Sequence, residues 1–503
     1  MIHHNAKFPL GFNQIRMITA LISLLFSVAA FYFDDVINRD GVMYMEMAQA
    51  YLDGGLEAMA KIYNWPLFAI LVACISKLLS SPLELTASAI NSVLFVLFTD
   101  ALLLISHRIL PNLRQVLIAA ILILSFYTIN DYRDFIIRDI GYWAFSGLAL
   151  YQLIRFLEHA DHRHAIFWQL SVITAVLFRV EGLVILLAMP LYVFVTQPCR
   201  PALKQLVQLN SIVIPATILL IMISLSYSGW VQAFDKLGSY LSYLNTEASE
   251  LQQLKQKLNL FEKEILSPFS ADYSTLILFS GLSVMMLYKL FKGLSISYLL
   301  LLGLAVWQQK QAPRIPWRGL IVYFTIVNIL ILTAFLFKHY FVVSRYCIMA
   351  IVGVFLLILP RLTQLIEQSW QQKKWWLFGL SSLIILAGVI DTFHTTSSKA
   401  YIKNTAIWAG QNLAAESRVL TNDEFIQYYF NTRPSQATLD YRPGGLKYYQ
   451  AYDYVIVVEK KRYRDLLTRL EQMQLELIYH ETSKRNNQAS VYRVISDGKK
   501  AEP

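Results

Sequence analysis

The residues best suited to chemistry follow the first hydrophobic run of the chain, residues 17–33, which carry no charge. Acids crowded beside such a run indicate either a solvated loop or a carboxylate that acts as a general base. Asp40 is the best placed of them, because a short helix that begins there puts Tyr44 on the same face. The helix dipole also favours a carboxylate at an N-terminus. The acids of this stretch are Asp34, Asp35, Asp40, Glu46, Asp53 and Glu57.

Three further clusters of charged residues interrupt apolar sequence. Each cluster also has a purely structural explanation: local ion pairs, a tight turn, or an interfacial anchor whose charged end reaches water. An arginine at such a depth is suited to binding a phosphate, since its planar fork donates two parallel hydrogen bonds. The clusters are NDYRDFIIRD at 130–139, with Asp134, Arg138 and Asp139; the turn with Arg179 and Glu181; and 338–346, with Lys338, His339, Arg345 and Tyr346.

Composition identifies the elements that must position these residues. The 503 residues are 56% hydrophobic and only 16% charged, whereas soluble domains carry about 25% charged residues. The net charge of +10 is typical of basic cytoplasmic loops and does not indicate nucleic-acid binding. Cys74, Cys199 and Cys347 are too far apart to suggest a disulfide framework or a metal site. The first run is longer than the core of a usual signal peptide. We therefore expect a polytopic α-helical membrane protein.

Apolar runs long enough to cross a bilayer recur through residues 1–391 and predict about 11 to 13 transmembrane helices. Segment 66–79 is short and is expected to be re-entrant or interfacial, because the basic loops then share the cytoplasmic side. The path of 273–308 stays open between one broken helix and a re-entrant 294–308. The runs are 17–33, 85–106, 115–129, 140–156, 165–178, 182–197, 206–227, 273–290, 294–308, 319–337, 346–360 and 375–391.

Two polar regions are expected on the outer side, together with the acid-rich loop 34–65. Insert 228–272 has helical spacing and predicts an amphipathic helix that lies on the membrane or covers a cavity. Residues 392–503 have no spanning run and predict a small soluble α/β domain. Its expected strands are 417–421, 453–459, 475–481 and 490–495, with helical patterns at 423–430 and 462–474.

Taken in order, the motifs of residues 15–391 resemble the type-C glycosyltransferase superfamily, in particular the bacterial relatives of protein O-mannosyltransferases and of the lipid A aminoarabinose transferase. Two positions depart from the pattern. Val180 replaces a proline that many relatives have, and Gly41 replaces a glutamate. The motifs are Asp40-Gly41-x-x-Tyr44, Gly54-Gly55, Trp65-Pro66-Leu67, Arg138-Asp139, Arg179-x-Glu181-Gly182 and Arg345-Tyr346.

The resemblance implies transfer of a hexose or pentose from a polyprenyl-phosphate-linked donor to an acceptor hydroxyl, by a single displacement at the periplasmic face of a bacterial inner membrane. Asp40 is expected to be the general base, with Asp139 or Asp134 assisting. The acceptor is a glycan, a lipid or a protein. The residues expected to bind the donor phosphate are Arg345, Arg138, Tyr346, His339 and Lys338, and those expected to bind substrate are Tyr44, Arg179, Glu181 and Trp65.

Two alternatives stay open at this stage. Asp139 is expected either to orient Arg138 or to hold a divalent cation, Mg²⁺ or Mn²⁺, together with Asp40; no other cofactor is expected. A transporter or flippase of a lipid-linked or anionic solute is the rival function, because buried arginines and acids also suit transport. The absence of internal repeats favours the enzyme.

Overall fold

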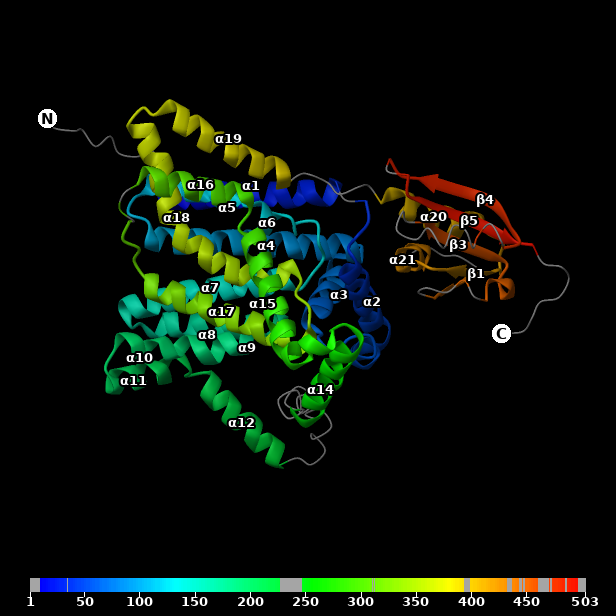
Figure 1. The fold of residues 1–503 in the computed structure, drawn as a ribbon, viewed down its shortest axis with the longest axis horizontal. Helices are drawn as coiled ribbons and strands as arrows, with labels where there is room; N and C mark the ends of the chain where they lie inside the picture. The colour runs from blue at the N-terminus through cyan, green and yellow to red at the C-terminus, as the bar shows by residue number, and fades with distance from the viewer. Residues whose placement is uncertain are drawn as a thin grey trace. The chain divides into compact units, whose positions relative to one another are not determined.

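The computed structural model describes residues 10–33, 35–226, 247–309, 311, 313–392, 399–431, 437–442, 446, 448–459, 470, 473–484 and 486–495 (Figure 1). Asp34 lies outside these residues, as do 228–246 of the expected insert and most of the helical pattern at 462–474. The chain begins with a long apolar helix and ends in a small sheet. The first helices are α1 (Phe12–Phe33), α2 (Arg39–Ala60), α3 (Leu67–Leu79), α4 (Leu83–Ile109), α5 (Leu113–Leu124), α6 (Tyr127–Asn130), α7 (Asp139–His159) and α8 (His162–Phe178).

The remaining helices match the expected apolar runs 273–290, 294–308, 319–337 and 375–391 to within a few residues, whereas the run 206–227 is broken and the helix of run 346–360 continues to Gln371. They are α9 (Gly182–Ala188), η1 (Met189–Tyr192), α10 (Val193–Thr196), α11 (Cys199–Leu209), α12 (Val213–Ser226), α14 (Glu247–Glu264), η2 (Pro268–Tyr273), α15 (Ser274–Gly293), α16 (Ile296–Gln308), α17 (Arg318–His339), η3 (Ser344–Cys347), α18 (Ile348–Gln371) and α19 (Trp375–Thr392).

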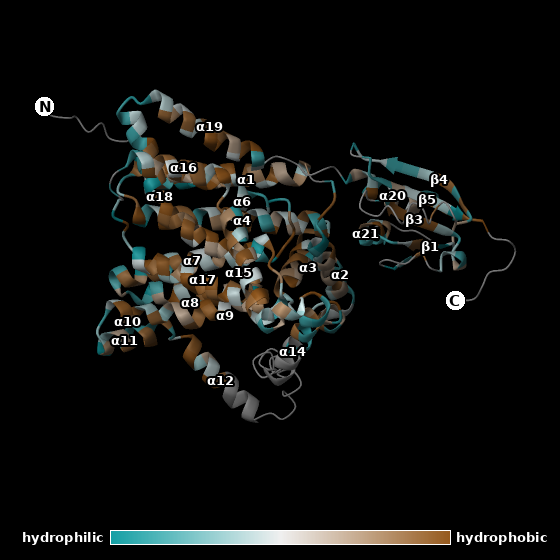
Figure 2. Cartoon of the chain, in the orientation of Figure 1, coloured by the Kyte–Doolittle hydropathy of each residue, from teal (hydrophilic) through white to brown (hydrophobic). Residues whose placement is uncertain are grey.

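The chain is a multi-pass membrane protein. Within the described residues, six helices are long and apolar enough to cross a bilayer, and a seventh span is possible if α11 and α12, bent by 62°, form one. Figure 2 shows the apolar colouring of these helices. Shorter apolar helices of 10–17 residues accompany them within the described residues: α5, α16, the run 182–196, and α3, which was expected not to cross.

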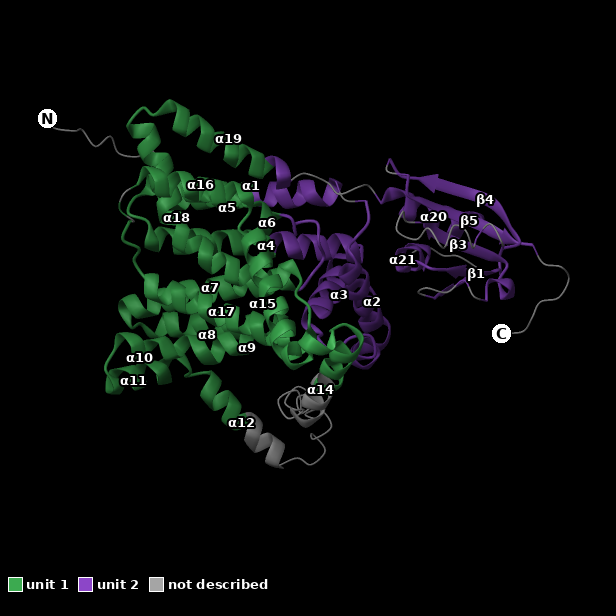
Figure 3. Ribbon diagram, viewed as in Figure 1, with its two compact units in different colours: residues 1–22, 94–130, 139–389 green, residues 23–93, 131–138, 390–503 purple. Residues whose placement is uncertain are grey.

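The chain forms two compact units (Figure 3). Unit 1 contains residues 1–22, 94–130 and 139–389, and therefore α5 to α19 and parts of α1 and α4. Unit 2 contains residues 23–93, 131–138 and 390–503, and therefore α2, α3 and the sheet. The boundary expected at residue 391 stays a prediction.

The end of unit 2 confirms the expected α/β character. A five-stranded sheet has the order β2-β1-β3-β5-β4, in which β1 pairs in parallel with β2 and β3, and β5 pairs antiparallel with β3 and β4. Four strands match the expected ones, and β2 is an addition. The elements are α20 (Ala400–Asn412), β1 (Arg418–Thr421), α21 (Glu424–Asn431), β2 (Thr438–Tyr441), η4 (Tyr449–Ala451), β3 (Tyr454–Glu459), β4 (Leu475–Thr482) and β5 (Gln488–Val494).

A buried arginine ties loop 131–138 to α1 within unit 2. Arg133 donates to the backbone carbonyl of Ser23 at 2.7 Å, to Ser27 Oγ at 2.7 Å and to Ser23 Oγ at 3.0 Å. Burial lowers the pKa of Arg133 to about 9, which still leaves the guanidinium charged at neutral pH. Nothing in the sequence pattern distinguished Arg133 from its charged neighbours Asp134 and Arg138.

Helix α2 bends where the chain has Gly54-Gly55. Gly55 has a φ of 68°, in the left-handed region that residues with a side chain rarely adopt. The glycine therefore allows the helix to change direction before the loop that carries Trp65.

Candidate active site

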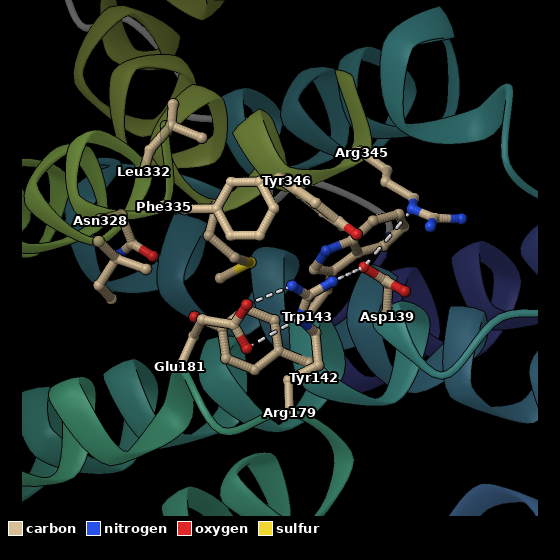
Figure 4. Close-up of a pocket in the computed structure, with 12 residues that line it drawn as sticks. Asp139, Tyr142, Trp143, Arg179, Glu181, Asn328, Leu332, Phe335, Arg345 and Tyr346 are labelled. Carbon is tan, nitrogen blue, oxygen red and sulfur yellow. Dashed lines mark hydrogen bonds and ion pairs between the residues drawn. The ribbon is translucent and has the colours of Figure 1, made fainter. Parts of the chain in front are cut away.

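A pocket in unit 1 brings together side chains from four stretches of sequence (Figure 4). They come from the start of α7, the turn before α9, the middle of α17 and the residues from η3 into α18. The pocket surrounds about 380 Å³ of space that atoms do not fill, counting the part open to solvent. The charged residues that line it are Asp139, Arg179, Glu181 and Arg345, each of which the sequence analysis had singled out.

Arg179 lies between two carboxylates at the centre of this pocket. Its Nη1 forms an ion pair with Asp139 Oδ1, its Nη2 with Glu181 Oε1, and its Nε donates to Glu181 Oε2 at 3.1 Å. The Asp139 and Arg179 side chains are only 5% and 7% exposed, so water screens their charges little. Asp139 is also the first residue of α7, where the helix dipole favours a negative charge.

The tight turn between α8 and α9 directs the Arg179 and Glu181 side chains into the same pocket. Gly182 N–H donates to the Arg179 carbonyl at 3.0 Å and closes the turn. A Cβ at Gly182 would lie 2.7 Å from the backbone nitrogen of Val176, which leaves no room for a side chain. The glycine of the Arg-x-Glu-Gly motif is therefore needed for close backbone packing, whereas Val180 is exposed and nothing in the turn requires a proline there.

Arg345 is the second guanidinium of the pocket. Its Nε lies 4.0 Å from Asp139 Oδ1, which is close enough for attraction but too far for a hydrogen bond. The Tyr346 ring lies between the two arginines, with the Arg179 Cζ 4.3 Å and the Arg345 Cζ 5.3 Å from its centroid. One aromatic ring therefore orders both cations, and Arg345 has the looser link to the shared carboxylate.

Apolar and amide side chains complete the walls, and the sequence analysis did not predict them. Tyr142 and Trp143 follow Asp139 by three and four positions on α7, a helical spacing that could have revealed them. Asn328 is the polar residue in the middle of the apolar α17, and its Nδ2 donates to the Phe324 carbonyl at 2.9 Å. Phe335, also on α17, packs its ring against Tyr346 at 4.8 Å.

Asp40 belongs to unit 2 and lies in the first turn of α2, as the sequence predicted. Asn38, just before the helix, accepts a hydrogen bond from Ile136 N–H at 2.7 Å. A Cβ at Gly41 would lie 3.0 Å from Asn38 Oδ1 and 3.1 Å from Ile136 Cβ. This close packing explains why position 41 has glycine and not the glutamate expected from the resemblance. Tyr44 is buried, with its ring edge-on to Phe68 at 5.1 Å.

Arg138 does not pair with Asp139 as one alternative expected. Its Nη2 donates to Tyr63 Oη at 2.9 Å, and its Cζ lies 5.2 Å from the Tyr63 ring centroid and 5.6 Å from that of Trp65. The carboxylate of Asp139 is taken by Arg179 instead, because the two side chains come together in unit 1. Asp134 is half-buried in unit 2.

Lys338 and His339 end α17 and do not line the pocket. The His339 ring is exposed and lies 4.5 Å from the Phe335 ring centroid, so it packs beside a wall of the pocket.

The donor set at Asp139 does not suit a divalent cation. One of its oxygens is held by Arg179 and lies 4.0 Å from a second guanidinium, and two such cations repel Mg²⁺ or Mn²⁺. Across the described residues, no three His, Cys, Asp or Glu side chains come together in a metal-binding arrangement. We therefore derive no step through a metal.

Two solved structures resemble this one along nearly its whole length. The first is a mutant of the arabinofuranosyltransferase AftD from Mycobacteria, with a TM-score of 0.49 and 13% identity over 97% of this chain and 42% of that one. The second is the Archaeoglobus fulgidus oligosaccharyltransferase, with a TM-score of 0.46 and 10% identity over 95% of this chain and 74% of that one. This chain thus spans less than half the length of the first. No family model and no curated protein matches the sequence.

Proposed function

We propose that this protein is a glycosyltransferase that moves a sugar from a polyprenyl-phosphate-linked donor to an acceptor hydroxyl. The observation that supports this most is a second guanidinium, that of Arg345, which lines a pocket within a membrane protein beside Tyr346 and 4.0 Å from Asp139. Its planar group is suited to a lipid phosphate that enters this pocket. A phosphate oxygen at that place gains a charge-assisted hydrogen bond.

We propose the following roles for the residues of the pocket. Arg179 is committed to two carboxylates and acts as a positioning residue, because it fixes Asp139 and Glu181 at the edge of the pocket. Arg345 carries the charge that stabilises the leaving phosphate. Asn328 and Trp143 line the pocket and offer a bound sugar a polar group and an apolar ring. Arg138 is proposed to bind the donor phosphate, and Tyr44 and Trp65 are proposed to bind substrate.

The reaction is a single displacement. Asp40 takes the proton of the acceptor hydroxyl as its oxygen bonds to the anomeric carbon of the sugar. The bond between that carbon and the phosphate oxygen breaks, and the polyprenyl phosphate leaves with the electron pair. No protonation of the leaving group is required, since a phosphate is stable as an anion. The configuration at the sugar inverts.

We place this reaction at the periplasmic face of a bacterial inner membrane, where the donor arrives laterally through the lipid. The acceptor is a glycan, a lipid or a protein that arrives from the periplasm. A metal role for Asp40 is tested by adding a chelator. If Asp40 acts as a base alone, transfer continues in its presence.

Transfer by protein reconstituted in liposomes tests the proposal, with polyprenyl phosphates that carry a radiolabelled pentose or hexose and an envelope extract as acceptor. Asp40→Asn should abolish transfer, because an amide does not accept the proton. Asp53→Asn is the matched control: it removes an exposed carboxylate from the same helix, where it accepts only from Gln49 at 2.9 and 3.1 Å. Full activity of Asp40→Asn would show that Asp40 is not the general base.

Donor binding tests the phosphate site separately. Arg345→Ala should weaken binding of the lipid donor by about 1.5–3 kcal/mol, the usual contribution of a hydrogen bond to a charged group. Arg318→Ala, which removes an exposed arginine at the first residue of α17, should leave donor binding unchanged. Equal affinity of both variants would refute the assignment. Passage of the labelled lipid across the bilayer without sugar transfer would favour the transporter or flippase.

A further inference from the structure

Helix α21 of the sheet region holds the two residues on either side of Asn38, at the start of α2. Tyr429 Oη accepts a hydrogen bond from the backbone N–H of Ile37 at 3.1 Å, in a buried position. Glu424 Oε2 accepts from Arg39 Nε at 2.9 Å. All of these residues belong to unit 2. Arg39 directly precedes Asp40, so both contacts lie within three positions of the proposed base.

Helix α21 is itself firmly tied to the sheet. Asp423 Oδ1 accepts from Phe425 N–H at 3.0 Å and caps the helix directly after β1. Tyr429 is 3% exposed, and Lys403 of α20 lies 4.7 Å from its ring centroid. The hydroxyl that reaches Ile37 is therefore carried on a buried side chain of a capped helix.

The opposite side of the same turn is held by loop 131–138. Asn38 Oδ1 accepts from Ile136 N–H, and Gly41 packs against the Ile136 side chain. The start of α2 thus forms hydrogen bonds with both this loop and α21. These contacts fix the backbone from which the Asp40 side chain extends.

We infer that Tyr429 and Glu424 are positioning residues for Asp40, and that the C-terminal sheet region thereby sets the rate of transfer. This inference rests on the proposed function. A general base must lie within hydrogen-bond reach of the proton it takes, and small displacements of a reacting group lower the rate strongly. Of the two contacts, the Tyr429 hydrogen bond contributes more to positioning Asp40, because it is buried. Arg39 is 76% exposed at its side chain, so water weakens its pair with Glu424.

The first test removes one hydroxyl. Tyr429→Phe keeps the ring and should lower kcat by about three- to tenfold, the fold-change that corresponds to loss of one hydrogen bond. The KM for the lipid donor should stay unchanged. Amide hydrogen exchange of residues 36–42 should become faster, and this readout does not depend on activity. Tyr479→Phe is the matched control, since it removes a hydroxyl that bonds only Glu481 within the sheet.

The second test exchanges charges. Glu424→Arg alone should speed exchange at residues 36–42, and adding Arg39→Glu should restore it, because the pair re-forms with opposite signs. Unchanged exchange and unchanged kcat in Tyr429→Phe would overturn the inference. If exchange quickens in Tyr429→Phe while Asp40→Asn retains full transfer, the contact stands but Asp40 is not the base, and the positioning role is rejected together with that assignment.

Discussion

Replacing Arg179 by glutamine should destabilise the protein far more than removing Arg345. The change leaves Asp139 and Glu181 without the cation that lies between them, and their side chains are only 5% and 20% exposed. Breaking a buried ion pair by removing one partner costs about 3–5 kcal/mol, because a charge stays behind without compensation. We expect a loss within that range for Arg179→Gln. For Arg345→Ala we expect a smaller loss, since Asp139 keeps its closer partner Arg179.

A double-mutant cycle isolates the electrostatic part of this cost. Asp139→Asn on the Arg179→Gln background should recover a substantial share of the lost stability, because a neutral amide needs no cation. The assay is chemical denaturation in mixed micelles, followed by tryptophan fluorescence. Trp143, which lines the same pocket, gives a local signal. A loss below about 1 kcal/mol for Arg179→Gln, or strictly additive effects of the two changes, would refute the view of Arg179 as the centre of the cluster.

Three further outcomes follow from unit 2. Gly41→Ala should lower the melting temperature and transfer together, since the added methyl group crowds Asn38 and Ile136; overpacking of this kind costs about 1–3 kcal/mol. An unchanged melting temperature of Gly41→Ala would show that the backbone can shift to make room for the methyl group. Desolvation, and then the nearby Glu424, raise the pKa of Glu46 above its usual 4.5. The stability contribution of Glu46 is therefore greatest at low pH and is lost as the pH rises through the raised pKa. Glu46→Gln should stabilise the protein slightly at neutral pH and flatten its pH profile, and the effect should be small because Glu46 is exposed to water. Equal pH profiles of both proteins would contradict this. A reporter enzyme fused after residue 503 should be active only in the periplasm, and a cytoplasmic signal would reverse the proposed orientation.

Much of the architecture was predictable because helix and strand patterns are local. The uncharged run 17–33 lies within α1, and the acid at position 40 indicated a helix start that α2 confirms. Strands such as 453–459 were recognisable because short β-branched runs favour extended chains. The exact path of each apolar run through the bilayer was harder to predict, since an apolar run does not reveal where a helix ends. Leu113–Leu124 and Ile296–Gln308 have 12 and 13 residues, fewer than the roughly 20 that a straight span needs.

The sequence by itself identified Asp139, Arg179, Glu181 and Arg345 as unusual, because charged residues between apolar helices are costly and rarely accidental. Only the tertiary structure decided their partners. Asp139 is adjacent to Arg138 in sequence yet pairs with Arg179, forty positions away, because helix packing and not chain proximity decides which charges meet in a region that water does not screen. Arg133 shows the same principle, since only packing against α1 reveals a buried guanidinium that bonds to two serines.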